Sequence, residues 1–200
     1  MVKILAFSDL HSNVDATRAI VHESTDADLL IGAVDLGNFG QGVDDVIATL
    51  RQAICPTVLI AGNHDNLEHL RTACTGWQDC HVLHAETVSL AGLTIFGLGA
   101  EIPRRNPADW NFALTEHAAA PLLARCPDGA LLVTHMPPFG HADQQRDGRH
   151  DGSHAVAESI AARQPALSLC GHVHSAWGTS GQIGKTPIHN LGPKPNWYEL

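Results

Sequence analysis

Short apolar runs alternate along the chain with segments in which apolar residues recur every three or four positions. An unbroken short apolar run is typical of a strand buried on both faces, and the helical spacing is typical of an amphipathic helix. Their alternation predicts βα units around a largely parallel inner sheet. The expected buried strands are Val2–Phe7, Asp28–Val34, Thr57–Ala61, Leu131–Thr134 and Leu167–Cys170.

The clearest expected helix covers residues 43–54, where apolar residues return at helical spacing. Ser12 or Asn13 is expected to cap an earlier helix that ends near Ser24, because these side chains accept hydrogen bonds from the first free amides of a helix. Three further helices are expected at about residues 66–74, 112–124 and 154–163, with Pro121 bending or shortening the second of them.

The pattern changes between residues 81 and 99, where two strand-like runs flank a turn at Ala91-Gly92 and predict an antiparallel pair. Residues 141–153 are too polar for a core and are expected to form a surface loop. The segment 181–186 looks like part of a phosphate-binding P-loop, but it lacks the required first glycine and the strand-to-helix setting. We therefore expect a hairpin there.

The chain has 200 residues, of which 44% are hydrophobic, so a single domain over residues 1–200 is expected. It carries 12 Lys and Arg against 21 Asp and Glu, a net charge of -9 with histidine neutral. A chain this acidic lacks the broad basic surface that binds duplex nucleic acid or an anionic membrane, and neither partner is expected. The oligomeric state is left open.

The apolar run after Lys3 is too short for a secretory leader, and no run approaches the length of a membrane span. The five cysteines are scattered without a Cys-x-x-Cys pair, which favours reduced thiols over a disulfide framework or a structural zinc site. We therefore expect a cytoplasmic protein.

Polar side chains follow directly after each of the five expected buried strands. In an open α/β sheet, ligands bind at this carboxyl edge. Residues two apart on an extended chain point the same way. Asp9 and His11 can therefore reach into one site together, and so can His172 and His174. The residues at the strand ends are Asp9, His11, Asp35, Asn63, His64, Asp65, His135, His172 and His174.

Carboxylates, an amide oxygen and several imidazoles form a mixed donor set that suits Mn, Fe or Zn and not Ca²⁺. Seven ligands exceed what one ion needs, and they suit two ions about 3.5–4 Å apart with a carboxylate between them. Any one such motif arises easily by chance. Five in order at strand ends are different, because partly buried charges are costly unless they are paired or bound to a metal. The sequence therefore predicts a dinuclear metal site.

These motifs resemble the signature of the calcineurin-like metallophosphoesterases. They span residues 9–174 in the order of that family, and the single-domain form is similar to its small bacterial and archaeal members. The resemblance implies a four-layered α/β/β/α sandwich, in which two mixed β-sheets pack face to face with helices outside. The matching residues are Asp9-x-His11, Asp35, Gly62-Asn63-His64-Asp65, His135 and Gly171-His172-x-His174.

The resemblance also implies a role for each matching residue. A hydroxide between two divalent metals would attack phosphorus in line. His64 would contact the phosphate and protonate the leaving oxygen, with Asp65 as its candidate partner. The first metal would be held by Asp9, His11 and His174, the second by Asn63, His135 and His172, and both by the bridging Asp35.

Two positions depart from the family pattern. Val34 stands where the family has a glycine before the bridging aspartate, which suggests a slightly altered backbone. Asn38 stands where many members have a second aspartate that partners the catalytic histidine. An amide does not stabilise an imidazolium as a carboxylate does, so acid catalysis by His64 is expected to be weaker. Asn38→Asp is then expected to help poor leaving groups more than good ones.

Other polar residues near the motifs are candidate substrate ligands. Arg104 and Arg105 follow a short strand expected at Ile102-Pro103, and Arg149 and His150 lie in the polar loop. An arginine binds phosphate through two parallel hydrogen bonds, although a surface arginine is more often simply solvated. The candidate substrate-binding residues are Asn13, Arg104, Arg105, Arg149 and His150.

The leading hypothesis is hydrolysis of a small phosphodiester, because the sequence holds no large cap domain that would select an elaborate substrate. The first alternative is a phosphomonoesterase or a protein phosphatase of the same fold. The second is a binding or scaffold member that has lost activity, which is disfavoured because all seven ligands and His64 are present. A nuclease is disfavoured by the negative charge.

Overall fold

The computed structural model describes residues 1–200, which form eleven strands and five helices. The strands are β1 (Lys3–Phe7), β2 (Leu29–Ala33), β3 (Thr57–Ile60), β4 (Cys80–Val82), β5 (Glu86–Leu90), β6 (Leu93–Leu98), β7 (Leu131–Thr134), β8 (Leu167–Cys170), β9 (Ser180–Ile183), β10 (Thr186–Asn190) and β11 (Asn196–Glu199). The helices are α1 (Val14–Glu23), α2 (Val43–Leu50), α3 (Leu67–Ala73), α4 (Glu116–Leu123) and α5 (His154–Arg163). Two short 3-10 turns cover Ser24–Asp26 and His174–Ala176.

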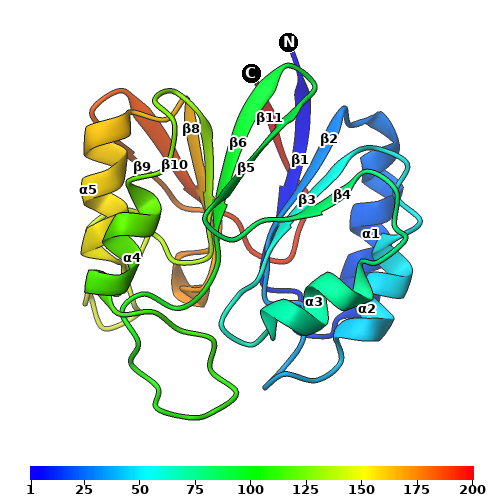
Figure 1. Cartoon of the computed structure of the whole chain (residues 1–200), viewed down its shortest axis with the longest axis horizontal. Coiled ribbons are helices and arrows are strands. Elements are labelled where there is room, and N and C mark those ends of the chain that lie inside the picture. Colours follow the sequence, from blue (N-terminus) through cyan, green and yellow to red (C-terminus); the bar gives the residue numbers. More distant parts are fainter.

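Two mixed sheets form the centre of the molecule. The first has the strand order β11-β1-β2-β3-β4, and the second has the order β5-β6-β7-β8-β10-β9. The inner strands of both sheets are parallel, and β11, β5 and β9 add antiparallel edges. Helices α1 to α3 cover the outer face of the first sheet, and α4 and α5 cover that of the second (Figure 1). The expected four-layered α/β/β/α sandwich is confirmed.

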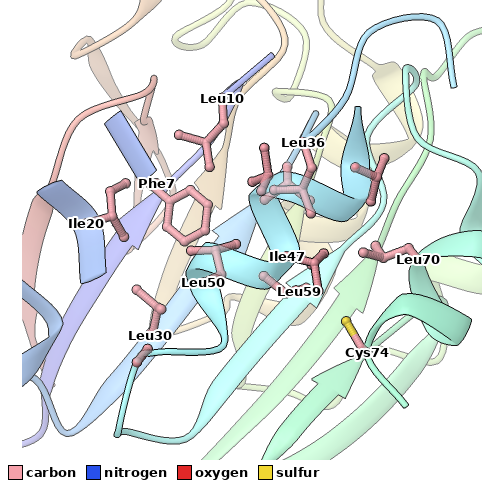
Figure 2. Packing of buried hydrophobic residues seen from close by; sticks show 14 of the residues in the cluster. Phe7, Leu10, Ile20, Leu30, Leu36, Ile47, Leu50, Leu59, Leu70 and Cys74 are labelled. Atoms are coloured by element: carbon pink, nitrogen blue, oxygen red, sulfur yellow. The ribbon is translucent and has the colours of Figure 1, made fainter. Parts of the chain in front are cut away.

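Three apolar clusters fill the spaces between the four layers. Successive strand residues point to opposite faces of a sheet. Leu5 and Phe7 therefore pack in the cluster under α1, α2 and α3, whereas Ile4 and Ala6 pack between the two sheets. Figure 2 shows Phe7 among its neighbours in the first of these clusters. The third cluster, which includes Phe96, lies between the second sheet and the helices α4 and α5. Burial on both faces explains why the inner strands are unbroken apolar runs.

The parallel arrangement decides where the polar strand ends lie. β1 runs away from the chain termini, which lie together at one end of the molecule (Figure 1). Parallel strands share this direction, so their carboxyl ends gather at the opposite end, near the long loop that follows β6. The residues that follow β1, β2, β3, β7 and β8 are thereby brought to one edge.

The expected helices are found with corrected ends. Asn13 caps α1, because its side chain accepts a hydrogen bond from the amide of Ala16. α2 ends at Leu50 and does not extend to residue 54 as expected. Ile54 stands at helical spacing from the apolar residues of α2, but it is 80% exposed and does not belong to the buried face of the helix. α4 begins at Glu116 instead of residue 112, where the side chain of Thr115 caps it.

The antiparallel pair expected across the turn at Ala91-Gly92 is confirmed, because β5 pairs with β6, but the first of the two runs is not a single strand. β4 pairs with β3 in the first sheet, and β5 pairs with β6 in the second. The chain crosses between the sheets at 83–85, where Ala85 has a φ of 55°. No glycine or proline marks this crossing, so the pattern gave no sign of it. The short strand expected at Ile102-Pro103 is also absent, and only an isolated bridge between Glu101 and Ala113 occurs there.

The hairpin expected near residues 181–186 is confirmed as β9 and β10. The polar loop 141–153 contains more internal structure than expected. Asp143 is buried, and its carboxylate accepts hydrogen bonds from the amides of Gly140 and Gly152 and lies 2.6 Å from Nδ1 of His150. The loop is therefore organised around the buried side chain of Asp143.

All five cysteines are free thiols, and Cys74, Cys126 and Cys170 are buried. No helix has both the length and the apolar character needed to cross a membrane.

Candidate metal centre

The candidate ligands lie on sharp turns directly after the strands. Asp9 and His172 have φ values of 52° and 67°, a region that residues other than glycine rarely adopt. Gly62 and Gly171 let these turns pack closely, because a Cβ on Gly62 would lie 2.0 Å from Oδ1 of Asp35 and one on Gly171 would lie 2.7 Å from Oδ2 of Asp9. Any larger residue at either glycine would push a candidate ligand away.

Asp9, His11 and His174 form the first set of ligands, which we call the exposed metal group. Each offers one ligand atom, and these atoms lie within 4.8 Å of one another. Nε2 of His174 lies 3.0 Å from Nε2 of His11 and 3.8 Å from Oδ1 of Asp9. The indole of Trp177 donates a hydrogen bond of 2.9 Å to the other oxygen of Asp9. The side chain of His174 is 50% exposed.

Asp35, His135 and His172 form the second set, the buried metal group, in which Asp35 and His135 are buried. Nε2 of His135 lies 3.4 Å from Oδ2 of Asp35 and 3.2 Å from Nδ1 of His172. Oδ1 of Asn63 lies 3.0 Å from Nδ1 of His172 and 3.2 Å from Nε2 of His135. Four donor atoms therefore converge on one point.

The donor set fits two divalent cations. Oδ2 of Asp35 lies between the groups, 3.9 Å from Nε2 of His11 and 3.4 Å from Nε2 of His135. Imidazole nitrogens that face each other at 3.0 and 3.2 Å repel through their lone pairs unless a cation or a proton lies between them. Two such facing pairs with a shared carboxylate match the dinuclear arrangement that the sequence predicts.

Hydrogen bonds on the far side of two rings fix their tautomers. Nδ1 of His135 lies 3.2 Å from the carbonyl oxygen of Ala33, which only accepts, so Nδ1 carries a proton and the neutral ring presents the lone pair of Nε2 to the site. Nδ1 of His11 lies 3.0 Å from Oδ1 of Asn38, whose Nδ2 donates to the carbonyl of His11. The expectation that Asn38 partners His64 is therefore wrong, because Asn38 orients a candidate metal ligand instead.

The buried metal group has strongly shifted pKa values. Burial raises the pKa of Asp35, but His135 and His64 together outweigh burial and lower the pKa to about 2. Burial lowers the pKa of His135, but Asp35, Asp9 and the hydrogen bond to Ala33 together outweigh burial and raise the pKa to about 9. Burial lowers the pKa of His172 to about 3. In the metal-free protein, His135 and Asp35 thus form a buried ion pair.

His64 lies beside the exposed metal group, with its ring centroid 5.1 Å from that of His11. Its Nδ1 accepts a hydrogen bond of 3.0 Å from the amide of Phe39, so the ring proton lies on Nε2. Burial lowers the pKa of His64. The rings of Phe39 and Trp110 pack on it with centroid distances of 4.9 and 4.7 Å. His64 is thus a neutral group with one N–H donor held by its neighbours.

Asp65 does not contact His64, which corrects the expected pairing. Its buried carboxylate accepts hydrogen bonds from the amides of Leu36, Gly37 and Gly62. These bonds tie the turn after β2 to the turn after β3. Burial and the Asp35 carboxylate raise the pKa of Asp65 to about 6, while two of these amides oppose the shift. Asp65 therefore positions the turns that carry ligands.

The structure gives three of the five candidate substrate ligands other roles. The side chain of Asn13 caps α1. Arg104 donates to two backbone carbonyls of its own loop. His150 is held by Asp143 in the polar loop. None of the three has a contact with a candidate metal ligand.

The other two arginines lie nearer the ligands, but each is paired with an acidic residue. Nε of Arg105 lies 3.1 Å from a carboxylate oxygen of Asp151. Nε of Arg149 lies 2.6 Å from a carboxylate oxygen of Asp147. Arg149 also lines a recess of about 330 Å³ that His174 borders. Neither arginine offers an unpaired charge to the site.

The sequence prediction of the site did not include Phe39, Asn111 or Glu101. Phe39 holds His64, and Asn111 donates to Glu101 and accepts from a candidate ligand. Asn111 and Glu101 lie in the long loop after β6, which has no periodicity and no motif. No signal in the sequence pointed to them.

Comparisons with known proteins agree with this geometry. The sequence profile of the family described as calcineurin-like phosphoesterase matches residues 2–176. The chain is 28% identical over 209 residues to UPF0046 protein K07C11.7 of Caenorhabditis elegans, which covers 94% of this chain and 69% of that protein. It is 26% identical over 153 residues to UPF0046 protein T07D4.2 of the same organism, which covers 71% of this chain and 37% of the relative.

Among solved structures, TT1561 of Thermus thermophilus superposes with a TM-score of 0.74 at 20% sequence identity, covering 99% of this chain and 98% of that one. This likeness shows the fold. The family match includes every candidate metal ligand and His64. The chain therefore belongs to the calcineurin-like phosphoesterases.

Proposed function

We propose that this protein is a dinuclear metal-dependent phosphoesterase that hydrolyses small phosphodiesters. The observation that carries the proposal is the pair of metal groups at one sheet edge with Asp35 between them. Membership of the family supports hydrolysis of a phosphoric ester. The nitrogen and oxygen donors suit Mn, Fe or Zn as the two ions.

The residues around the metal groups support a division of labour. Two divalent cations would supply an activated water for in-line attack and would neutralise charge on the phosphate. His64 presents its Nε2–H to the phosphate or to the leaving oxygen, because its Nδ1 is occupied by the amide of Phe39. Phe39 is 58% exposed and His174 is 50% exposed, so the substrate approaches from solvent on this side.

The pairing of the arginines favours a diester over a monoester. A phosphomonoester carries up to two negative charges, and enzymes usually hold it with arginine forks. Arg105 and Arg149 are each paired with an aspartate. A diester carries a single negative charge and needs no such fork. Hydrolysis of a monoester or of a phosphoprotein is the alternative.

The roles of His64 and Asp35 are tested by comparing metal content with turnover. His64→Ala is expected to keep both ions and to lose about 10²–10⁴-fold in turnover. Asp35→Ala is expected to lose metal occupancy itself, because this carboxylate serves both groups. His69→Ala, an exposed histidine of α3 bound to Asp44, is the matched control and should leave both quantities unchanged. Unchanged turnover of His64→Ala would refute its role.

The substrate class is tested with matched model substrates. Bis-aryl and mono-aryl phosphates with the same leaving group are assayed with Mn, Fe and Zn in turn. A higher kcat/KM for the diester is expected, and a higher value for the monoester would favour the alternative. If the metal-loaded protein turned over no phosphoester and bound a protein partner, a scaffold role would replace the enzyme.

A further inference from the structure

Asn63 differs from the other candidate metal ligands because only one end of its side chain can bind a cation. The two oxygens of a carboxylate are equivalent, whereas an amide has one oxygen and one NH₂ group of nearly the same size. Packing therefore does not choose between the two orientations of Asn63. Hydrogen bonds must make that choice.

The long loop that follows β6 supplies these hydrogen bonds. Nδ2 of Asn63 donates to Oδ1 of Asn111 at 3.0 Å. Nδ2 of Asn111 donates to Oε2 of Glu101 at 2.7 Å and to the carbonyl oxygen of Asn106 at 2.8 Å. The amide of Phe112 donates to the carbonyl of Asn63 at 2.9 Å, so the same loop also holds the main chain. The side chains of Asn63, Glu101 and Asn111 are all buried.

The chemistry of the partners decides which group donates and which accepts in each of these hydrogen bonds. A backbone carbonyl and a carboxylate oxygen both accept, so Asn111 must turn its nitrogen toward Asn106 and Glu101. Its oxygen then faces Asn63, which must turn its own nitrogen toward Asn111. Glu101 is itself held, because the amide of Arg105 donates to the same Oε2 at 3.1 Å.

This series of hydrogen bonds ends at Asn63, in the buried metal group. With its nitrogen facing Asn111, Asn63 directs Oδ1 to the point where it lies 3.0 Å from Nδ1 of His172 and 3.2 Å from Nε2 of His135. The geometry points to Glu101 and Asn111 as positioning residues that orient the Asn63 oxygen toward the ion of the buried metal group. This inference rests on the proposed function, because it takes Asn63 as a metal ligand.

The size of the effect follows from comparable sites. Replacing a residue that hydrogen-bonds to a metal ligand and fixes its orientation usually lowers metal affinity by about 10–100-fold. The loss should be confined to the buried metal group, because neither residue contacts a ligand of the exposed metal group. A residue needed only for folding of the loop would not discriminate between the two ions in this way.

The direct test replaces Asn111 with leucine, which has a similar shape and no acceptor. Mn²⁺ binding is measured by isothermal titration calorimetry, and His174→Ala assigns the phase that belongs to the exposed metal group. Asn111→Leu is expected to weaken binding at the buried metal group about 10–100-fold and to leave the other phase unchanged. Asn106→Ala is the matched control in the same loop, because that side chain accepts only from the amide of Ala108.

A double-mutant cycle separates orientation from folding. Asp at position 63 presents an oxygen whichever way it turns, so in an Asn63→Asp background Asn111→Leu should not weaken Mn²⁺ binding. It should strengthen binding, because the Asn63→Asp carboxylate faces the acceptor oxygen of Asn111. Equal weakening in both backgrounds, or no weakening in either, would overturn the inference.

A pair of variants at Glu101 covers the case in which Asn111→Leu does not fold. Glu101→Leu removes the oxygen that accepts from Nδ2 of Asn111 and should weaken Mn²⁺ binding at the buried metal group, whereas Glu101→Gln keeps an accepting oxygen there and should retain it. Equal Mn²⁺ binding by these two variants would also overturn the inference. Normal binding of two ions without hydrolysis of any phosphoester would refute the proposed function alone. If the native protein hydrolyses a phosphoester but Asn111→Leu weakens Mn²⁺ binding equally in the native and Asn63→Asp backgrounds, only the positioning role is refuted. Failure of the native protein to bind any divalent ion would refute both.

Discussion

The two metal groups contain the same kinds of donor in different surroundings. The buried metal group has Asp35 and His135 nearly out of contact with solvent, whereas His174 of the exposed metal group is half exposed. Charges interact more strongly where water is excluded. Accordingly, Asp35 and His135 shift each other's pKa in opposite directions, while burial lowers the pKa of His174. The two groups therefore differ in how deeply their histidines are buried, from His135 with no exposed side-chain surface to the half-exposed His174.

The stability of the metal-free protein should show the largest difference between the groups. His135→Ala leaves the Asp35 carboxylate buried without its opposite charge, which is expected to lower the free energy of unfolding by about 3 kcal/mol. His174→Ala removes a half-exposed ring and should cost about 0.5 kcal/mol or less. Urea denaturation in the presence of EDTA measures both values. Equal costs would show that burial does not separate the groups.

Metal uptake should depend on pH in one group and not in the other. A ligand histidine must be neutral, and the pKa of His135 in the metal-free protein is raised to about 9. Binding at the buried metal group therefore releases a proton, and its affinity should rise about tenfold per pH unit between pH 7 and 9. The pKa of His174 is lowered, so affinity at the exposed metal group should be flat over this range. Calorimetric titrations with Mn²⁺ at several pH values measure both.

Exposure should also decide the order in which the ions leave. A chelator reaches an ion beside the half-exposed His174 directly, whereas the ion beside His135 is released only when the surrounding turns open. A coloured chelator is therefore expected to report two phases of equal amplitude. His174→Ala should remove the fast phase and leave the slow one. A single phase in the native protein would contradict the difference between the groups.

The smallest expected effect concerns Asn38. Because Asn38 contacts His11 and not His64, Asn38→Asp provides a stronger acceptor behind a metal ligand. It should tighten Mn²⁺ binding at the exposed metal group by about tenfold or less and leave the buried metal group unchanged. The dependence of turnover on leaving-group pKa should stay the same, which a series of aryl phosphodiesters checks. A selective gain for poor leaving groups would restore the role first expected for Asn38.

The sequence was informative wherever a feature depended on neighbours along the chain. The apolar runs located the inner strands because these are buried on both faces, and Asn13 marked the start of α1 through a local cap. The crossing at Ala85 was missed because a single residue in a left-handed conformation leaves no trace in the hydrophobic pattern. The extension of α2 to Ile54 was wrong because helical spacing does not guarantee burial.

The departures from the family pattern show the same limit at the site. Val34 is buried in the cluster against the helices α1 to α3, and Asp35 still reaches both metal groups beside it. Asn38 and Asp65 were each assigned to His64 on the basis of their position in the sequence. In the structure, Asn38 hydrogen-bonds to His11, and Asp65 accepts hydrogen bonds from three backbone amides.

By itself, the sequence determined the fold class and the set of candidate metal-binding side chains at the strand ends. Both depend on local patterns, because an apolar run followed by polar residues places those residues at the carboxyl edge of a parallel sheet. The family resemblance had already divided the candidate ligands into two sets, and only the tertiary structure decided which set is the more deeply buried and which residues orient its members. Asn111 lies 48 residues from Asn63, and Asn38 lies 27 residues from His11. Contacts between loops so far apart follow no period in the sequence, since they form only when the sheets and their turns pack together.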